Sequence, residues 1–204
     1  MSILNRNDQS GRSMVEMLGV LAIIGVLSVG GISGYSKAMA KYKLIKAQDQ
    51  ITMLIMNIRA AYATSPSYSG INEQTVAEYN LAPNEMVASK DSGKYLISTF
   101  GEEVGISPMG DNNTYFQIKI GGLGKEACRS LASSDWGADG LVMMGVNEPS
   151  ESSCSISGGK TVTAGSGGAS GGSGQWCVAG LPASLSDVAD ACNNETNYIA
   201  WTFY

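Results

Sequence analysis

A single carboxylate lies near the start of the longest apolar segment of the chain. Residues 14–32 read MVEMLGVLAIIGVLSVGGI, and Glu16 is their only charged residue. A helix needs about 20 apolar residues to cross the hydrocarbon core of a bilayer, so the length of this segment predicts a membrane span. An unpaired carboxylate in lipid costs several kcal/mol, so we expect Glu16 to have a partner and a function.

The rest of the chain offers little catalytic chemistry. It contains 0 histidines, which removes the commonest general base and the commonest transition-metal ligand. The serines have no histidine to activate them, so the sequence predicts no catalytic residues, no metal site and no cofactor. Residues 1–64 hold seven Lys/Arg against three acids, and residues 65–204 hold six against fifteen. An acidic outer domain does not favour nucleic acid as a partner.

The cysteines Cys128, Cys154, Cys177 and Cys192 all lie in the C-terminal half. Their spacing contains no C-x-x-C pair, which disfavours a zinc knuckle or a thioredoxin-like redox site. An even number of cysteines beyond an apparent export signal favours two structural disulfides in an oxidising compartment. Three pairings are open on this reasoning.

One long helix should carry Glu16 toward the C-terminal domain. Apolar residues recur at three- and four-residue steps as far as Tyr62, and the first proline is Pro66. We therefore expect a helix from about Ser13 to Thr64. Its first half is apolar on all sides and its second half is amphipathic, with a face that should pack on the C-terminal domain.

Beyond Pro66 the pattern predicts an α+β domain. Strands are expected at residues 94–100, 114–120, 141–146 and 197–203, and helices after Asn72 and at residues 125–133 and 184–192. The fold class is therefore a long N-terminal helix packed on an antiparallel β-sheet.

The segment Gly11-Arg12-Ser13-Met14-Val15-Glu16, followed by the apolar run, resembles the N-terminal signature of type IV pilins. The short leader and the large cysteine-containing domain resemble most the type IVb branch of major pilins. The resemblance implies that a membrane peptidase cuts after Gly11 and that the new amine at Arg12 is N-methylated. Glu16 is then the fifth residue of the mature chain, as in the family. In the family the first mature residue is usually apolar, whereas here it is Arg12.

The resemblance also implies a division into four regions. These are a leader at residues 1–11, an apolar assembly helix at 12–35, an amphipathic helix at 36–64 and a pilin domain at 65–204 with a glycine-rich loop at 157–174. Glu16 would meet the terminal amine of a neighbouring subunit. By position in the family, Cys128 pairs with Cys192, which leaves Cys154 to pair with Cys177.

The glycines of the apolar helix allow two interpretations. Gly30, Gly31 and Gly34 weaken the helix interior, and Gly30 and Gly34 have a G-x-x-x-G spacing that permits close helix approach. Similar pilins unwind locally in this zone when packed in a filament. Membrane helices also tolerate glycine without any such role.

The implied partners are identical subunits in a homopolymer, the inner membrane before assembly, and the prepilin peptidase with the pilus assembly machinery. Host-cell, bacterial or phage receptors are further candidates. The lysines Lys37, Lys41, Lys43 and Lys46 follow the apolar run, and the positive-inside tendency alone favours a cytoplasmic C-terminal domain. The cysteines and the resemblance favour a periplasmic domain that later becomes extracellular. The alternative functions are a minor pilin, a type II secretion pseudopilin and, more remotely, a membrane-tethered periplasmic enzyme.

Overall fold

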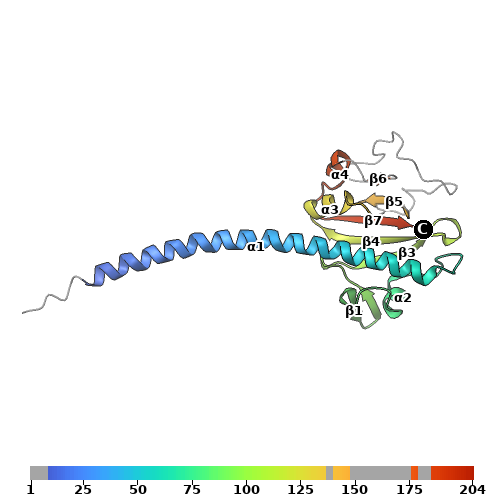
Figure 1. Cartoon of the computed structure of the whole chain (residues 1–204), viewed down its shortest axis with the longest axis horizontal. Helices are drawn as coiled ribbons and strands as arrows, with labels where there is room; N and C mark the ends of the chain where they lie inside the picture. The colour runs from blue at the N-terminus through green and yellow to red at the C-terminus, as the bar shows by residue number, and fades with distance from the viewer. Residues whose placement is uncertain (1–8, 137–139, 148–175, 179–184) are drawn as a thin grey trace, which may run out of the picture. The chain divides into compact units, whose positions relative to one another are not determined.

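The computed structural model describes residues 9–136, 140–147, 176–178 and 185–204 (Figure 1). The chain divides into two compact units, residues 1–42 and residues 43–204, and each is described by itself. Helix α1 (Gln9–Tyr62) provides all of the described structure of the first unit and the opening segment of the second. The predicted long helix is therefore confirmed, with an end at Tyr62, where Ser65 N donates to the Tyr62 carbonyl in a turn.

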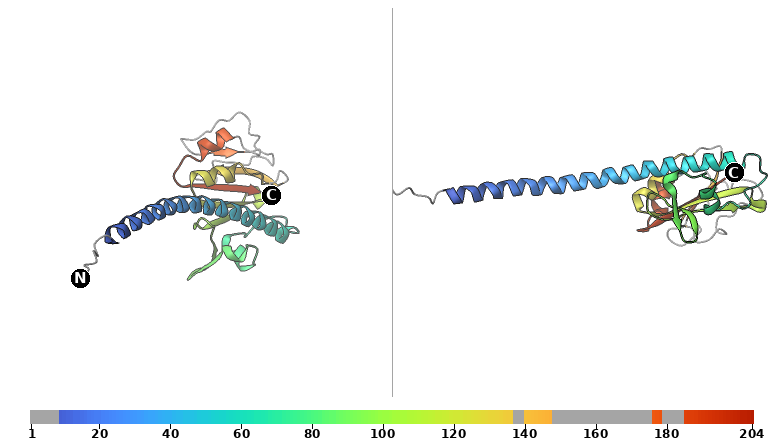
Figure 2. Two further views of the ribbon diagram at one scale, coloured as in Figure 1. Left: turned by 60° about the vertical axis from the view of Figure 1, so that its left-hand side comes forward. Right: turned by 90° about the horizontal axis from the view of Figure 1, so that it is seen from below.

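The second unit is built on a five-stranded antiparallel sheet. Its strands follow the order β3-β4-β7-β5-β6, so the strand nearest the C-terminus lies in the middle. Figure 2 shows the last turns of α1 crossing one face of this sheet. The strand bounds are β3 (Val104–Met109), β4 (Tyr115–Leu123), β5 (Leu141–Val146), β6 (Trp176–Val178) and β7 (Asn197–Phe203).

Short helices and a small second sheet complete the unit. Strands β1 (Val87–Lys90) and β2 (Gly93–Leu96) form a separate antiparallel pair. Asn72 caps helix α2 (Glu73–Glu78) by accepting from Thr75 N at 2.8 Å. The remaining elements are the 3-10 turns η1 (Asn84–Met86) and η2 (Asp111–Asn113) and the helices α3 (Lys125–Ala132) and α4 (Leu185–Ala191).

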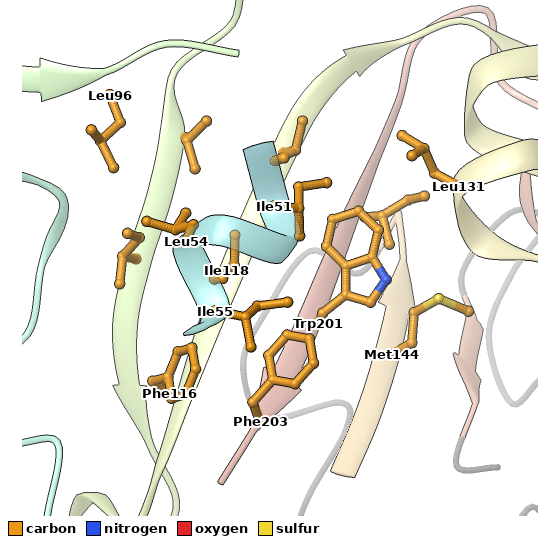
Figure 3. Close-up of a cluster of buried hydrophobic side chains, with 14 of the residues drawn as sticks. Ile51, Leu54, Ile55, Leu96, Phe116, Ile118, Leu131, Met144, Trp201 and Phe203 are labelled. Atoms are coloured by element: carbon orange, nitrogen blue, oxygen red, sulfur yellow. The ribbon is translucent and has the colours of Figure 1, made fainter. Parts of the chain in front are cut away.

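The core lies between α1 and the sheet. Ile51, Leu54 and Ile55 of α1 point toward the aromatic side chains of β4 and β7 (Figure 3). The buried face of the helix contains residues at three- and four-residue steps because these lie on one side of an α-helix. Its members are Ala47, Gln50, Ile51, Leu54, Ile55 and Ile58.

The buried face of α1 begins later than the periodicity indicates. Tyr35, Tyr42 and Ile45 continue the apolar pattern in the sequence, yet 67%, 57% and 55% of their surfaces are exposed. The spacing of apolar residues identifies a face but not what covers it. Leu44 is half-buried against the core, and the fully buried face of the helix begins at Ala47.

The predicted strand at residues 94–100 is wrong beyond Leu96. Ile97 forms one isolated bridge with Glu103, and the chain then turns, with Gly101 N donating to the Ser98 carbonyl at 3.0 Å. Gly101 has a φ of +90°, which glycine adopts without the strain that a side chain would bring. The strand-forming residues KYLISTF therefore divide between a strand and a reverse turn.

Candidate assembly site

The apolar half of α1 has its side chains open to the surroundings. From Met14 to Ile32 the large hydrophobic residues are between 52% and 76% exposed. Among the described residues this is the one helix long and apolar enough to cross a membrane, with a mean hydropathy of 2.2 in its most apolar window. So large an apolar surface must be covered by lipid or by protein, because water does not solvate it favourably.

Glu16 lies on this exposed helix, two residues into the apolar run. The backbone of Gly11 and Arg12 belongs to the same helix, so the predicted cleavage position is on α1, one turn before Glu16. The glycines Gly30, Gly31 and Gly34 have helical backbone, and no heavy atom lies within 4 Å of the position that a Cβ would take at each. A neighbouring helix could therefore approach the backbone there.

A basic segment follows the apolar run. Lys37, Lys41 and Lys43 are exposed on α1. Lys46 differs from them, because its ammonium forms an ion pair with the carboxylate of Glu85 in η1. This ion pair attaches the segment after Lys43 to the rest of its own unit.

A disulfide joins the domain helix to the C-terminal part of the chain. Cys128 in α3 is bonded to Cys192, directly after α4, with 5.7 Å between their Cα atoms. Both cysteines are fully buried. The pairing is the one that the resemblance implied. Cys154 and the glycine-rich loop at 157–174 lie outside the described residues, as does the side chain of Cys177, whose backbone pairs with Gly145 in the sheet.

Two buried asparagines hold the strand ends next to this disulfide. Asn147 Nδ2 donates to Asn197 Oδ1 at 2.8 Å and to the Ala191 carbonyl at 3.0 Å. Asn197 Nδ2 in turn donates to the carbonyls of Leu123 at 3.1 Å and Asn194 at 2.8 Å. The pair thereby connects β4, β5 and β7 to the end of α4. Neither residue was predicted from the sequence, because asparagines next to strand ends are common in turns.

A shallow cleft of about 340 Å³ lies beside β3 and β4. Glu73, Glu102, Glu103, Lys119 and Tyr198 contribute its polar lining. Three of these side chains have partners: the Glu103 carboxylate bonds the Lys90 ammonium, and the Lys119 ammonium lies 4.1 Å from the centre of the Tyr198 ring. Within the described ranges, no three His, Cys, Asp or Glu side chains group closely enough to hold a metal ion.

The comparisons with known proteins agree with this anatomy. The major structural subunit of the bundle-forming pilus of Escherichia coli O111:H- is 27% identical over 151 residues, which cover 73% of this chain and 76% of that protein. Among solved structures, the type IVb pilin from Salmonella typhi aligns with a TM-score of 0.53 at 12% identity, over 76% of this chain and 95% of that one. TcpA, a type IV pilin from Vibrio cholerae El Tor, aligns with a TM-score of 0.54 at 16% identity, over 79% and 98%.

The family itself follows from a match over most of the sequence. A family model described as bundlin matches residues 37–180, a range that excludes the apolar helix and so adds to the N-terminal signature. The expected family and fold class are both confirmed. The chain belongs to the bundlin family, and its fold is that of the type IVb pilins.

Proposed function

We propose that this pilin is the major subunit of a type IVb pilus, held in the inner membrane after leader cleavage and polymerised through its N-terminal helix into a surface filament. The observation that carries the proposal is the exposed apolar half of α1, with Glu16 as its one charge, in a chain of the bundlin family. The relatives named as major structural subunits support the major over the minor role. The filament would serve adhesion, aggregation or conjugation-type contact.

The exposed helix surface gives the subunit two stable environments. In the membrane, lipid covers the side chains from Met14 to Ile32, and in the filament the same helices of identical subunits cover one another. Transfer of the helix from one environment to the other changes its hydrophobic free energy little, because lipid tails and packed apolar helices both exclude water. The polar contacts must therefore decide which copies meet and in what register.

Glu16 is the group that fixes this register in our proposal. Peptidase cleavage after Gly11 frees an α-amine at Arg12, and N-methylation leaves that amine able to carry a positive charge. A carboxylate in apolar surroundings is stable only when an opposite charge neutralises it, so the Glu16 carboxylate of one subunit would pair with the terminal ammonium of its neighbour. The prepilin peptidase and the pilus assembly machinery are the partners that this route needs.

Gly30, Gly31 and Gly34 would allow the helix to unwind locally in the filament. Each glycine weakens a helix interior by about 1 kcal/mol relative to alanine. Their backbone is helical in the isolated chain, so the proposal is that packing among subunits drives the change.

Replacement of Glu16 tests the proposal. Glu16→Ala should leave the protein in the membrane fraction with its Cys128–Cys192 disulfide formed, yet abolish filaments seen by electron microscopy. Glu195→Ala, which removes an exposed carboxylate from the second unit, is the matched control and should assemble normally. Normal filaments from the Glu16→Ala variant would falsify the pairing.

Analysis of purified filaments separates the major from the minor role. If the chain is the major subunit, it forms the bulk of the filament protein, whereas a minor pilin or pseudopilin is a trace component. Mass spectrometry of the same sample should find a chain that starts at Arg12 with one added methyl group. An intact leader in filaments would contradict the cleavage at Gly11.

A further inference from the structure

The lysines directly after the apolar run share an unusual environment. Lys37, Lys41 and Lys43 are exposed, and the sequence from Met17 to Gln48 contains no acidic residue that could neutralise them. Tyr35, 67% exposed, precedes the group on the same helix, and Tyr42, 57% exposed, lies between Lys41 and Lys43. We call these three lysines and two tyrosines the collar.

The collar surrounds the helix and does not mark one face of it. At roughly 100° per residue, Lys37 and Lys41 lie on one side of α1, Lys43 lies on the opposite side, and both tyrosines lie on a flank between them. A protein partner that docks on a helix contacts one face. A membrane surface contacts a helix that passes through it on every side, so the collar fits a membrane surface better.

The distances along the helix also fit. With a rise of about 1.5 Å per residue, the Cα atoms of the three lysines lie roughly 7 to 17 Å beyond Ile32. Each headgroup layer is about 5 to 8 Å thick, and a surface potential extends about 8 Å further at physiological salt. Tyr35 comes shortly after the apolar run, and the first lysine, Lys37, lies just beyond it. A tyrosine at the membrane interface with lysines beyond it is typical of residues that anchor a helix at a set depth.

The side of the membrane makes the collar notable. The buried Cys128–Cys192 disulfide places the second unit in an oxidising compartment, so the collar faces away from the cytoplasm. Lysines usually concentrate on the cytoplasmic side of a span. A cluster retained against this tendency needs a compensating interaction, and the anionic headgroups of the leaflet supply one.

We propose that Lys37, Lys41 and Lys43 bind anionic phospholipid headgroups at the membrane surface next to the folded domain while the subunit waits in the membrane. This rests on the proposed membrane storage and specifies its lipid partner. These contacts set the depth of the apolar run in the bilayer. They must break when the subunit leaves the membrane for the filament.

A lipid-binding measurement on the full chain tests the proposal. The protein is purified in neutral-detergent micelles, phosphatidylglycerol or phosphatidylcholine is added, and native mass spectrometry gives the affinity for each lipid. A lysine near an anionic surface contributes about a fivefold gain, so Lys37→Gln with Lys41→Gln should reduce the preference for phosphatidylglycerol about 30-fold. Added salt should weaken binding to the wild type more than binding to this variant.

Matched variants control for total charge. Lys94→Gln with Lys125→Gln removes the same charge from exposed positions in the second unit and should keep the lipid preference. Lys37→Arg with Lys41→Arg should also keep it. Inorganic phosphate at the same concentration should not displace the lipid, since the collar binds headgroups held in a layer.

Each other result has a defined meaning. Equal affinity for the two lipids, or an unchanged preference in Lys37→Gln with Lys41→Gln, overturns the proposal and leaves membrane storage standing. If this variant keeps the lipid preference but forms no filaments, the lysines contact acidic groups of a second copy instead. Wild-type protein that stays monomeric in water without detergent contradicts membrane storage itself.

Discussion

Two buried amide side chains connect several elements of the second unit. Asn147 and Asn197 are 7% and 1% exposed, and between them they bond carbonyls from β4, α4 and the turn before β7. A buried donor or acceptor that loses its partner costs about 1–3 kcal/mol. These two side chains therefore stabilise the place where the strand ends meet the disulfide.

Asn197→Ala should lower the free energy of unfolding by about 2–4 kcal/mol, because it removes the partners of two carbonyls and of the Asn147 amide. Denaturant unfolding of the protein in neutral detergent measures the change. Asn193→Ala, at an exposed position four residues earlier, serves as the control and should change stability by less than about 0.5 kcal/mol. Equal stability of the two variants would show that the amide network contributes little.

Tyr68 predicts a pH dependence. Burial raises the pKa of the Tyr68 hydroxyl, and the positive charge of Arg59 opposes part of that rise. Because the pKa is higher in the folded state, the contribution to stability is complete below about pH 10, the unfolded value, and is lost as pH rises through the folded value. The free energy of unfolding of Tyr68→Phe should therefore fall less steeply than that of the wild type as pH rises from neutral to strongly alkaline values. Parallel stability curves for the two proteins would contradict the shift.

Among single residues, the sequence identified those whose type is unusual for its surroundings. Glu16 was recognisable because a carboxylate in an apolar run is costly, and the Cys128–Cys192 bond followed from the family resemblance. Asn147 and Asn197 were not recognisable, because asparagine is common in turns and nothing in its spacing shows that two such residues meet 50 positions apart.

The periodicity of apolar residues predicted most of the helices and strands but not all of them. The helix α1, the strands β4, β5 and β7 and the helices α2, α3 and α4 all correspond to predicted segments. Strand β3 was not predicted. It contains Pro108, which it tolerates because β3 is an edge strand, where a missing N–H is allowed. Strands β1 and β6 were missed as well, since four and three residues give too short a pattern.

The two faces of α1 in the second unit should respond differently to truncation. Leu54→Ala removes a fully buried side chain from the core and should cost about 2–5 kcal/mol. Met53→Ala changes the adjacent residue, which is 55% exposed, and should cost less than about 1 kcal/mol. Thermal unfolding of both variants checks the difference. Similar losses would mean that α1 is held to the sheet by something other than this face.

At the scale of the whole molecule, the disulfide links two positions that are far apart in the sequence. It closes a loop between positions 64 residues apart, for which the chain-entropy model gives roughly 4 kcal/mol. Cys128→Ser with Cys192→Ser should lower the unfolding free energy by about that amount, measured against the oxidised wild type. The control is wild-type protein treated with reductant, which should lose a similar amount. An unchanged stability after reduction would contradict the structural role of the bond.

The position of β7 has a consequence for the folding rate. Residues 197–203 fill the gap between β4 and β5, strands that precede them by roughly 50 to 90 residues in the chain. Strands β4 and β5 each pair with β7 and not with each other, so residues 197–203 join the two halves of the sheet. The sheet therefore forms through pairings between segments far apart in the sequence, and such a topology slows folding.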